Sequence, residues 1–345
     1  MSDVATSPAL LSARSLSRDF TTRAAGRFWN AKRVTHAVED VSLDLYQGRV
    51  TAIVGESGSG KSVLARMLAR IVTPTSGQLV FDGTTIEPHH KRGLDYAAQV
   101  QLVLQDPFAS INPIHPIRHC LERPLLIHGA TKDDVAALAG AALTRVALDP
   151  PERFLDRYPH ELSGGQLQRV SIARALCVRP KVLLADEPIS MLDVSVRLGI
   201  LNLLKGLCVS EQLAILYITH DIASARYLAD EVIVMYAGQI VERSFGTSLV
   251  DEPAHPYTQL LVASVPDPEA LDEARVVGQH EKLEVATVGC RFAPRCPHAM
   301  EVCRTTSPPN VELAPGHVSR CWLHTREANA SLRVNARRVD EGGDI

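Results

Sequence analysis

Apolar residues recur along the chain with two different periods, which predict strands and helices in turn. Alternating or continuous apolar runs predict strands at residues 10–20, 37–45, 50–54, 182–185, 214–219 and 231–235. Apolar residues three and four positions apart predict helices at residues 61–71, 135–146, 166–177, 194–209 and 222–229. Strands that alternate with helices indicate an α/β fold, in which a mostly parallel sheet carries helices on both faces. Between the second and third strands, Gln47 and Gly48 predict a hairpin turn.

The character of the sequence changes twice, and these changes predict the domain organisation. Proline-spaced helical segments at about residues 107–175 predict a helical part within a main domain at residues 1–266. After Pro266, prolines, cysteines and charged residues replace the apolar periodicity, so we expect a small Cys-rich C-terminal appendage at residues 267–330. Residues 331–345 are polar and predict a flexible tail.

Composition and charge narrow the class of protein. Of 345 residues, 46% are hydrophobic and 22% are charged, so the chain can bury a full core. The net charge of -3 gives no support to a general nucleic-acid-binding role. The longest apolar runs are far shorter than the ~20 residues that span a bilayer, and the first residues lack the pattern of a signal peptide. We therefore expect a cytoplasmic protein that reaches a membrane only through a partner.

A glycine-rich segment between a predicted strand and a predicted helix has the pattern G-x-x-x-x-G-K-[ST]. Its residues are Gly55, Glu56, Ser57, Gly58, Ser59, Gly60, Lys61 and Ser62. The glycines allow backbone N–H groups to close around phosphates, and the following helix directs its positive dipole end at them. Lys61 would reach the β- and γ-phosphates, and the Ser62 hydroxyl would bind Mg²⁺. The alternative is a glycine-rich turn with a chance lysine, but the order strand, motif, helix favours a nucleotide site.

Two carboxylates follow the buried strand predicted at residues 182–185, in the segment VLLADEP. Ligands of open parallel sheets bind at the carboxyl ends of the strands. Asp186 would hold Mg²⁺ through water, and Glu187 would orient and deprotonate an attacking water molecule. The alternative is a solvated acidic turn, but the presence of the phosphate loop favours the magnesium and water site.

The segment LSGGQ at residues 162–166 places two glycines at the start of a predicted helix, where glycine weakens helix formation. Ser163 can cap that helix, while Gly164 and Gly165 leave its first N–H groups bare, and a bare helix N-terminus attracts anions. Because the chain already carries one phosphate loop, a second anion site suggests two subunits that each cover the other's nucleotide. The alternative is an ordinary serine-capped helix.

Together, GESGSGKS, LSGGQLQR and LLADEP resemble the motifs of the ATP-binding cassette (ABC) ATPase family, over about residues 10–266. This resemblance implies a P-loop ATPase core with an antiparallel β subdomain and a helical signature subdomain. It also implies head-to-tail dimers that hold each ATP between the phosphate loop of one copy and the LSGGQ of the other. Ser163, Gly164, Gly165 and Gln166 would then lie at the partner's nucleotide.

The same resemblance assigns roles to further residues. Gln105, in LVLQDPF, matches a glutamine that binds near Mg²⁺ and couples it and water to the membrane partner. His220, in YITHD, matches a histidine that touches the γ-phosphate, with a buried structural histidine as the alternative. Asp193, in SMLDVS, matches a loop that crosses the dimer interface, although Met191 stands where the family more often has alanine.

Adenine in this family usually stacks on an aromatic ring near the end of the first strand. Phe20 is the candidate here, and plain core packing is its alternative role. Phe28 and Trp29 are further candidates, because the loop after that strand is long.

Three longer segments, QDPFASINPIHPI, HPYTQLLVASVPDP and GCRFAPRCPHAMEVC, are similar to the oligopeptide/dipeptide importer branch. This implies an ATP-hydrolysing subunit that powers the uptake of di- and oligopeptides at the cytoplasmic face of the inner membrane. The implied partners are a second, non-identical ABC ATPase subunit, two integral membrane permease subunits and, indirectly, an extracytoplasmic solute-binding protein. Residues 107–122 would meet a short cytoplasmic helix of a membrane subunit.

Other functions stay open on the sequence alone. The solute of a related importer could be nickel, a glutathione-like compound or an oligosaccharide. A soluble cassette ATPase acting on DNA or ribosomes is a second alternative, but the paired cassettes or long coiled coil expected of it are not in the sequence. A non-hydrolytic regulatory subunit is a third, and the presence of Glu187 and His220 argues against it.

Four cysteines crowd the C-terminal region: Cys290, Cys296, Cys303 and Cys321. In a reducing compartment such a group indicates a metal site more than disulfides. The spacings are not C-x-x-C and match a zinc ribbon poorly, but four thiolates suit zinc or an iron–sulfur cluster. The importer branch shows this tail pattern, which in some members suits a [4Fe-4S] cluster. Zinc and free, packed thiols are the alternatives, and the expected role is structural.

Overall fold

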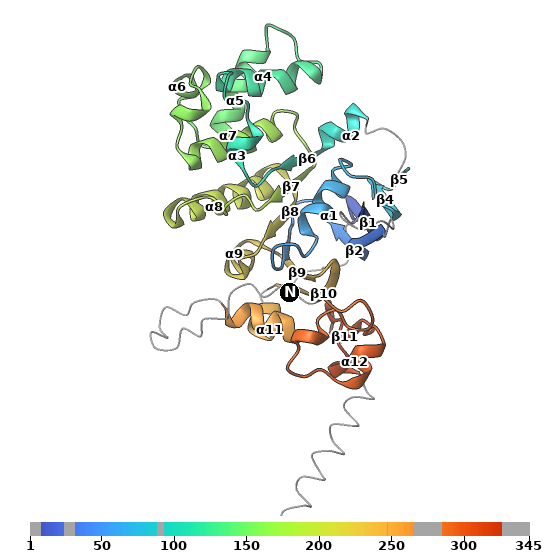
Figure 1. The fold of residues 1–345 in the computed structure, drawn as a ribbon. Coiled ribbons are helices and arrows are strands. Elements are labelled where there is room, and N and C mark those ends of the chain that lie inside the picture. The colour runs from blue at the N-terminus through green and yellow to red at the C-terminus, as the bar shows by residue number, and fades with distance from the viewer. Residues whose placement is uncertain (1–7, 24–31, 88–92, 247, 265–284, 326–345) are drawn as a thin grey trace, which may run out of the picture.

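The computed structural model describes residues 8–23, 32–87, 93–246, 248–264 and 285–325 (Figure 1). Two candidate adenine-stacking residues, Phe28 and Trp29, and the predicted tail lie outside these ranges. Within the ranges, the chain forms an 8-stranded sheet, a 4-stranded sheet and a group of helices that projects from them.

The larger sheet has a parallel centre that is buried on both faces. Its strand order is β11-β12-β10-β9-β3-β8-β7-β6. The parallel strands are β3 (Val50–Val54), β6 (Val100–Val103), β7 (Val182–Asp186), β8 (Ala214–Thr219) and β9 (Glu231–Tyr236). Along β3, Ala52 and Val54 pack in one hydrophobic cluster and Ile53 packs in the other, because successive side chains point to opposite faces. The predicted α/β class is confirmed.

Helices cover both faces of this sheet, as the apolar periodicity predicts. The helix on the Ile53 side is α1 (Lys61–Leu68), whose Leu64 and Leu68 are buried. The cluster on the Ala52 side includes residues of α7 (Gly164–Leu176), α8 (Val194–Glu211) and α9 (Ile222–Leu228). The short helix α2 (Leu94–Gln99), which leads into β6, was not predicted.

The smaller sheet is antiparallel and has the order β2-β1-β4-β5. Its strands are β1 (Leu11–Arg23), β2 (Lys32–Leu45), β4 (Ser76–Phe81) and β5 (Thr84–Ile86). The predicted hairpin at Gln47 and Gly48 is wrong, because β2 pairs with β1 while β3 lies between β8 and β9 in the other sheet. The turn therefore carries the chain from one sheet to the other.

A helical part follows β6 and extends away from the core (Figure 1). It contains α3 (Pro107–Ser110), α4 (Ile117–Ile127), α5 (Val135–Arg145), α6 (Glu152–Leu155), the 3-10 helix η1 (Pro159–Glu161) and α7. Its helices α4, α5 and α7 pack against one another, and their buried residues join the core cluster on the Ala52 side.

The C-terminal region completes the larger sheet. Its elements are β10 (Gln239–Phe245), α10 (Ser248–Asp251), α11 (Pro256–Ala263), η2 (Ala293–Arg295), α12 (Glu301–Thr305), β11 (Val311–Ala314), β12 (His317–Ser319) and η3 (Trp322–His324). Strand β12 pairs with β10, and the buried ring of Phe292 belongs to the main core. The expectation of a separate Cys-rich appendage is therefore not supported, because this region shares both sheet and core with the rest of the chain.

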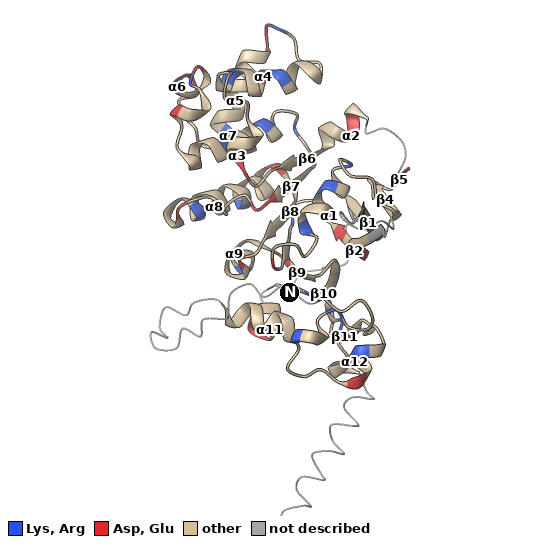
Figure 2. Ribbon diagram, viewed as in Figure 1, with Lys and Arg blue, Asp and Glu red and all other residues tan. Residues whose placement is uncertain are grey.

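No helix in the described ranges is both long enough and apolar enough to cross a membrane. Along the same ranges, Lys and Arg are interspersed with Asp and Glu in both the helical part and the core (Figure 2).

Candidate functional site

Four neighbouring strands, β3, β8, β7 and β6, bring the candidate residues to one edge of the sheet. The phosphate loop follows β3, His220 follows β8, Asp186 and Glu187 lie at the end of β7, and Gln105 follows β6. Because these strands are parallel, their carboxyl ends meet at the same edge, where open α/β sheets bind ligands. The topology thus assembles residues that are far apart in the sequence.

The glycines of the phosphate loop are required by close backbone contacts as well as by conformation. Gly60 caps α1 with a φ of 100°, a left-handed conformation that favours glycine. A Cβ atom at Gly60 would collide with the carbonyl oxygen of Ala37, and one at Gly55 would collide with that of Met235. Strands β2 and β9 therefore press against the loop and hold its shape.

Lys61 is folded back onto the loop that carries it. Its Nζ donates hydrogen bonds to the carbonyl oxygens of Gly55, at 2.7 Å, and Glu56, at 2.8 Å. Burial lowers the pKa of Lys61, and the nearby Glu187, Asp186 and Glu56 oppose that shift. A bound phosphate would add negative charge where Lys61 is buried, so this position fits the predicted contact with phosphates.

Ser62 and Asp186, the two residues predicted to hold Mg²⁺, lie side by side. The Ser62 hydroxyl donates to Oδ1 of Asp186 at 2.9 Å. Burial raises the pKa of Asp186, and the hydrogen bond from Ser62 opposes this effect. One carboxylate and one hydroxyl next to a phosphate site suit Mg²⁺, which is held by few protein oxygens together with waters and phosphates. Ser62 and Asp186 are therefore suitable ligands for a Mg²⁺ ion bound together with ATP.

Glu187 is the point on which the other catalytic candidates converge. Its Oε2 accepts a hydrogen bond from Gln105 Nε2 at 2.9 Å and lies 3.4 Å from His220 Nδ1. The backbone of Glu187 has a φ of 47°, which is uncommon for a residue other than glycine. Its N–H donates a hydrogen bond to the carbonyl oxygen of Ile218 at 2.9 Å. A strained turn fixed by β8 thus aims this carboxylate at the edge where the phosphates would lie.

The LSGGQ segment has the predicted cap and an unpredicted packing contact. The Ser163 hydroxyl accepts from the Gln166 N–H at 3.3 Å, and Oε1 of Gln166 accepts from the Ser163 N–H at 3.0 Å. A Cβ atom at Gly165 would lie 2.5 Å from Cγ1 of Val196 on α8, whereas one at Gly164 would have ordinary contacts. Gly165 is therefore needed for helix packing, which local sequence does not show.

The LSGGQ segment and the phosphate loop of one chain do not share a site. Helix α7 belongs to the helical part, which is separated from α1 in Figure 1. Asp193, at the N-terminus of α8, and Met191 are both exposed, the latter by 60%. These exposed residues lie on the loop that the sequence predicts at a subunit interface.

Phe20 lies near the phosphate loop on the smaller sheet. It pairs with Thr35 of β2, two positions before Ala37, the residue that touches Gly60. Its ring is only partly buried, and the guanidinium of Arg18 lies 4.7 Å from the ring centroid. The core-packing alternative is thus not what the structure has, while adenine stacking stays a prediction.

The four C-terminal cysteines line one small apolar cavity, together with His255, Phe292 and Trp322. Burial raises the pKa of Cys290 and Cys296, and raises that of Cys321 to about 12. Within the described ranges, no three His, Cys, Asp or Glu side chains are grouped so that they could hold a metal ion. Neither zinc nor an iron–sulfur cluster is therefore supported by this arrangement; the structure shows only that the thiols converge.

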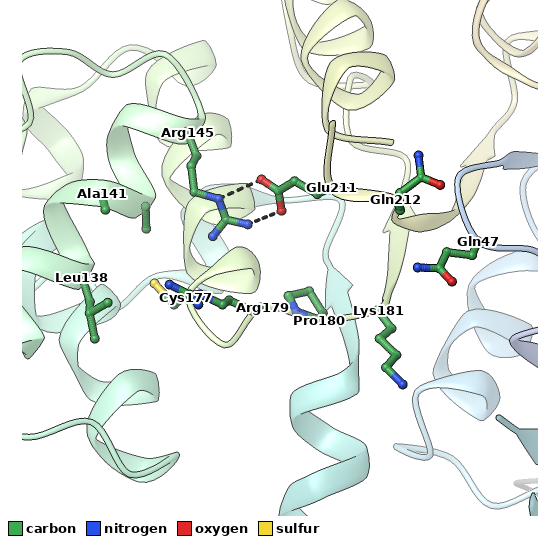
Figure 3. A pocket seen from close by; sticks show the side chains of 11 residues that line it. Gln47, Leu138, Ala141, Arg145, Cys177, Arg179, Pro180, Lys181, Glu211 and Gln212 are labelled. Atoms are coloured by element: carbon green, nitrogen blue, oxygen red, sulfur yellow. Dashed lines mark hydrogen bonds and ion pairs between the residues drawn. The ribbon is translucent and has the colours of Figure 1, made fainter. Parts of the chain in front are cut away.

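A larger cavity, of about 440 Å³, lies elsewhere, between the helical part and the core (Figure 3). Its walls include Arg145 of α5, which binds the carboxylate of Glu211 at the end of α8, and Lys181, which precedes β7. Lys181 and Asp186 lie at opposite ends of β7, so this cavity is at the far edge of the sheet from the phosphate loop.

Comparisons with known proteins agree with this geometry. Residues 38–190 match a family model described as ABC transporter, and residues 241–303 match one described as the C-terminal region of oligopeptide/dipeptide transporters. The chain is 38% identical over 324 residues to the oligopeptide transport ATP-binding protein AppF of Bacillus subtilis, covering 92% of this chain and 98% of that protein. A Brucella ovis relative, provisionally named a peptide import ATP-binding protein, is 40% identical over 317 residues, which cover 90% of this chain and 97% of the relative.

Two solved structures have the same cassette fold. A dimeric ATP-binding cassette in a post-hydrolysis state, bound to ADP and phosphate, has a TM-score of 0.58 and 27% identity, covering 68% of this chain and 98% of its own. A component of an ABC transporter complex from Clostridium perfringens has a TM-score of 0.61 and 27% identity, covering 71% and 91%.

The Glu187→Gln substitution tests the role of the carboxylate. An amide keeps the size of the side chain but cannot take a proton from water, so we expect ATP hydrolysis to fall by about 10²-fold or more. ATP binding should persist, since Lys61 and Ser62 are unchanged. Steady-state hydrolysis and equilibrium binding of ATP measure the two effects, with Glu152→Gln on exposed α6 as the matched control. Near-normal turnover in the Glu187→Gln protein would remove Glu187 from the base role.

The Gly165→Ala substitution tests the contact between α7 and α8. Its Cβ atom must displace Val196, so we expect a loss of about 1–3 kcal/mol in the free energy of unfolding. Gly164→Ala, which has room, should cause no such loss, and Val196→Ala should restore most of the stability of Gly165→Ala. Denaturant unfolding measures the stability of the wild type, Gly165→Ala, Gly164→Ala and the double variant Gly165→Ala/Val196→Ala. Equal losses at both glycines would show that helix packing is not the reason for Gly165.

Proposed function

The chain belongs to the ABC transporter family of ATP-binding proteins, and we propose that it is the ATP-hydrolysing subunit of an importer of di- and oligopeptides. The convergence of Gln105 and His220 on Glu187, beside Lys61 and Ser62, supports the ATPase role. The peptide class rests on relatives named for peptide import and oligopeptide transport, and on the matched C-terminal region.

Hydrolysis uses the residues at the edge of the sheet in separate roles. The phosphate loop binds the phosphates through its N–H groups, and Lys61 exchanges loop carbonyls for phosphate oxygens. Ser62 and Asp186 would hold the Mg²⁺, which would supply positive charge next to the phosphates. Glu187 takes a proton from water as the water oxygen attacks the γ-phosphorus, and the bond to ADP breaks. Gln105 and His220 orient Glu187 and the phosphate that leaves.

A head-to-tail dimer would complete the ATP site. The separation of α7 from α1 within one chain leaves the capped start of α7 available to a second copy's nucleotide. Ser163, Gly164, Gly165 and Gln166 would supply this contact, and the exposed Asp193 would lie across the interface. We infer a second ABC ATPase subunit in this position, of a sequence different from this chain.

The helical part supplies the surface for the membrane partners. Phe108 and Ile114, which follow Gln105 in the sequence, are 52% and 70% exposed. Asp106 caps α3 through the N–H groups of Phe108 and Ala109, and Arg174 of α7 donates to Ser110 at 2.7 Å. Apolar groups held this firmly at the surface suit a short helix of a permease at the cytoplasmic face of the membrane. Movement of that helix would reach Glu187 through Gln105.

We infer that residues outside this chain select the solute. A solute-binding protein outside the membrane and two permease subunits would do so, and nickel, a glutathione-like compound or an oligosaccharide is the second candidate class. The soluble cassette ATPase alternative is disfavoured by the match of residues 241–303 to transporters of peptides.

Uptake of labelled di-, tri- and longer peptides tests the proposed function in cells that depend on this chain for uptake. Glu187→Gln should abolish uptake because hydrolysis stops. Ile114→Asp should also reduce uptake by about tenfold or more, since a buried charge is costly, while leaving ATP binding by the isolated subunit unchanged. Glu152→Gln is the control for both. Peptide uptake that is unchanged when the whole chain is deleted would remove the peptide function, and labelled nickel and oligosaccharides would then be tested.

We also propose that the four C-terminal cysteines hold a [4Fe-4S] cluster with a structural role. The observation behind this proposal is that all four thiols line one apolar cavity, since Cys thiolates are the ligands that hold [4Fe-4S] clusters. The buried thiols would need a cationic group to ionise, because burial raises the pKa of Cys290, Cys296 and Cys321. The cluster would stabilise the turns on which these residues lie.

Anaerobic purification tests this assignment. The protein should be brown and contain iron and acid-labile sulfide, and Cys296→Ser should lose both. Cys120→Ser, on α4 in the helical part, should keep them, because Cys120 does not line this cavity. Colourless, iron-free protein with intact thiols would exclude the cluster, and zinc without iron would replace it by the zinc alternative.

A further inference from the structure

A residue of the C-terminal region forms an ion pair with the phosphate loop. Both terminal nitrogens of Arg295, on η2, donate to the carboxylate of Glu56, each at 2.9 Å. This two-bond arrangement between a guanidinium and a carboxylate is stronger and more directional than a single ion contact. The two side chains are 30% and 32% exposed, so water screens the pair only in part.

A second bond fixes the same loop residue through its backbone. The N–H of Glu56 donates at 2.9 Å to the hydroxyl of Tyr257, a fully buried residue at the start of α11. An N–H that already has a partner is not available to a phosphate. Glu56 therefore serves as the anchor of the loop.

Arg295 is held in place by aromatic rings. Its guanidinium carbon lies 5.8 Å from the ring centroid of Tyr236 and 5.7 Å from that of Phe292. The rings of Tyr236, Tyr257 and Phe292 also contact one another, with centroids 4.7 to 5.5 Å apart. The anchor of the loop is thus part of the rigid aromatic core that joins β9, α11 and the C-terminal region.

The same short helix that carries Arg295 also forms a wall of the cysteine cavity. Phe292 and Ala293, which precede Arg295, and Cys296, which follows it, all line that cavity. The backbone N–H of Cys296 bonds to Ala293, so the turn moves as one unit. A change in the cavity would therefore reach the Glu56 carboxylate through Arg295. A second route leads from Phe292 of the cavity wall to Tyr257, which binds the Glu56 N–H.

We propose that Arg295 is a positioning residue for the phosphate loop, and that it makes ATP affinity depend on the packing of the cysteine cavity. This inference rests on the ATPase role proposed above. It does not depend on which solute is transported, or on whether a cluster fills the cavity. The ligand is a nucleoside triphosphate. Arg295 affects its binding by fixing the shape of the loop that holds the phosphates.

A double-mutant cycle tests the pair, using binding of a non-hydrolysed ATP analogue with Mg²⁺ to the full chain. Glu56→Gln and Arg295→Gln should each weaken binding about tenfold, and the double variant should be no weaker than either single variant. Arg320→Gln, whose side chain bonds to Pro308 within the C-terminal region, is the matched control and should bind normally. Independent, additive losses, or affinities within about twofold of wild type, would overturn the pair's role.

A second cycle tests the link to the cavity. Cys296→Ser should weaken analogue binding in the wild-type background and have a clearly smaller effect in the Arg295→Gln background. An equal effect in both backgrounds would show that the cavity does not act through Arg295. Thermal unfolding of each variant separates these outcomes from loss of folding, because a purely structural role would lower Tm without the predicted coupling in affinity. Since transport is not measured, failure here is distinguishable from failure of the peptide function.

Discussion

Burial of the parallel strands on both faces is the constraint on which the rest of the molecule depends. A strand such as β3 must send alternate residues into two different cores, so its direction and register are fixed over its whole length. Because β3, β8, β7 and β6 lie side by side, the loops that follow them also lie next to one another. The contact of Gln105 and His220 with one oxygen of Glu187 is a consequence of that packing.

Much of this could be predicted from local sequence, because the relevant signals are local. Strands β3, β7, β8 and β9 and helices α1, α5, α7, α8 and α9 each have a clear apolar period, and the motif residues lie at their ends. The predicted group of Ser62, Asp186, Glu187, Gln105 and His220 is brought together as expected. Short β6, with four residues, has too few positions to show a period, and it was missed.

The errors of sequence reasoning come from contacts between distant residues. The change of sheet after Gln47 and Gly48 depends on the partners of β2 and β3, which no turn signal reveals. The C-terminal region was expected to form a separate appendage, but its strand β12 pairs with β10 of the main sheet. Gly165 faces Val196, and Glu56 faces Arg295 across 239 positions of sequence. Each case needs the three-dimensional neighbour before the residue can be explained.

The pairing of β12 with β10 has a further consequence for the behaviour of the chain in solution. Without β11 and β12, the seven residues of β10 would form an open sheet edge, a template on which other chains can add strands. Strand β12 covers the middle of this edge, where it pairs with Glu242 and Arg243, and the outermost strand there, β11, has only four residues, of which Glu312 is exposed. Because short, charged edges resist strand addition, the C-terminal region shields the middle of β10 from pairing with other chains.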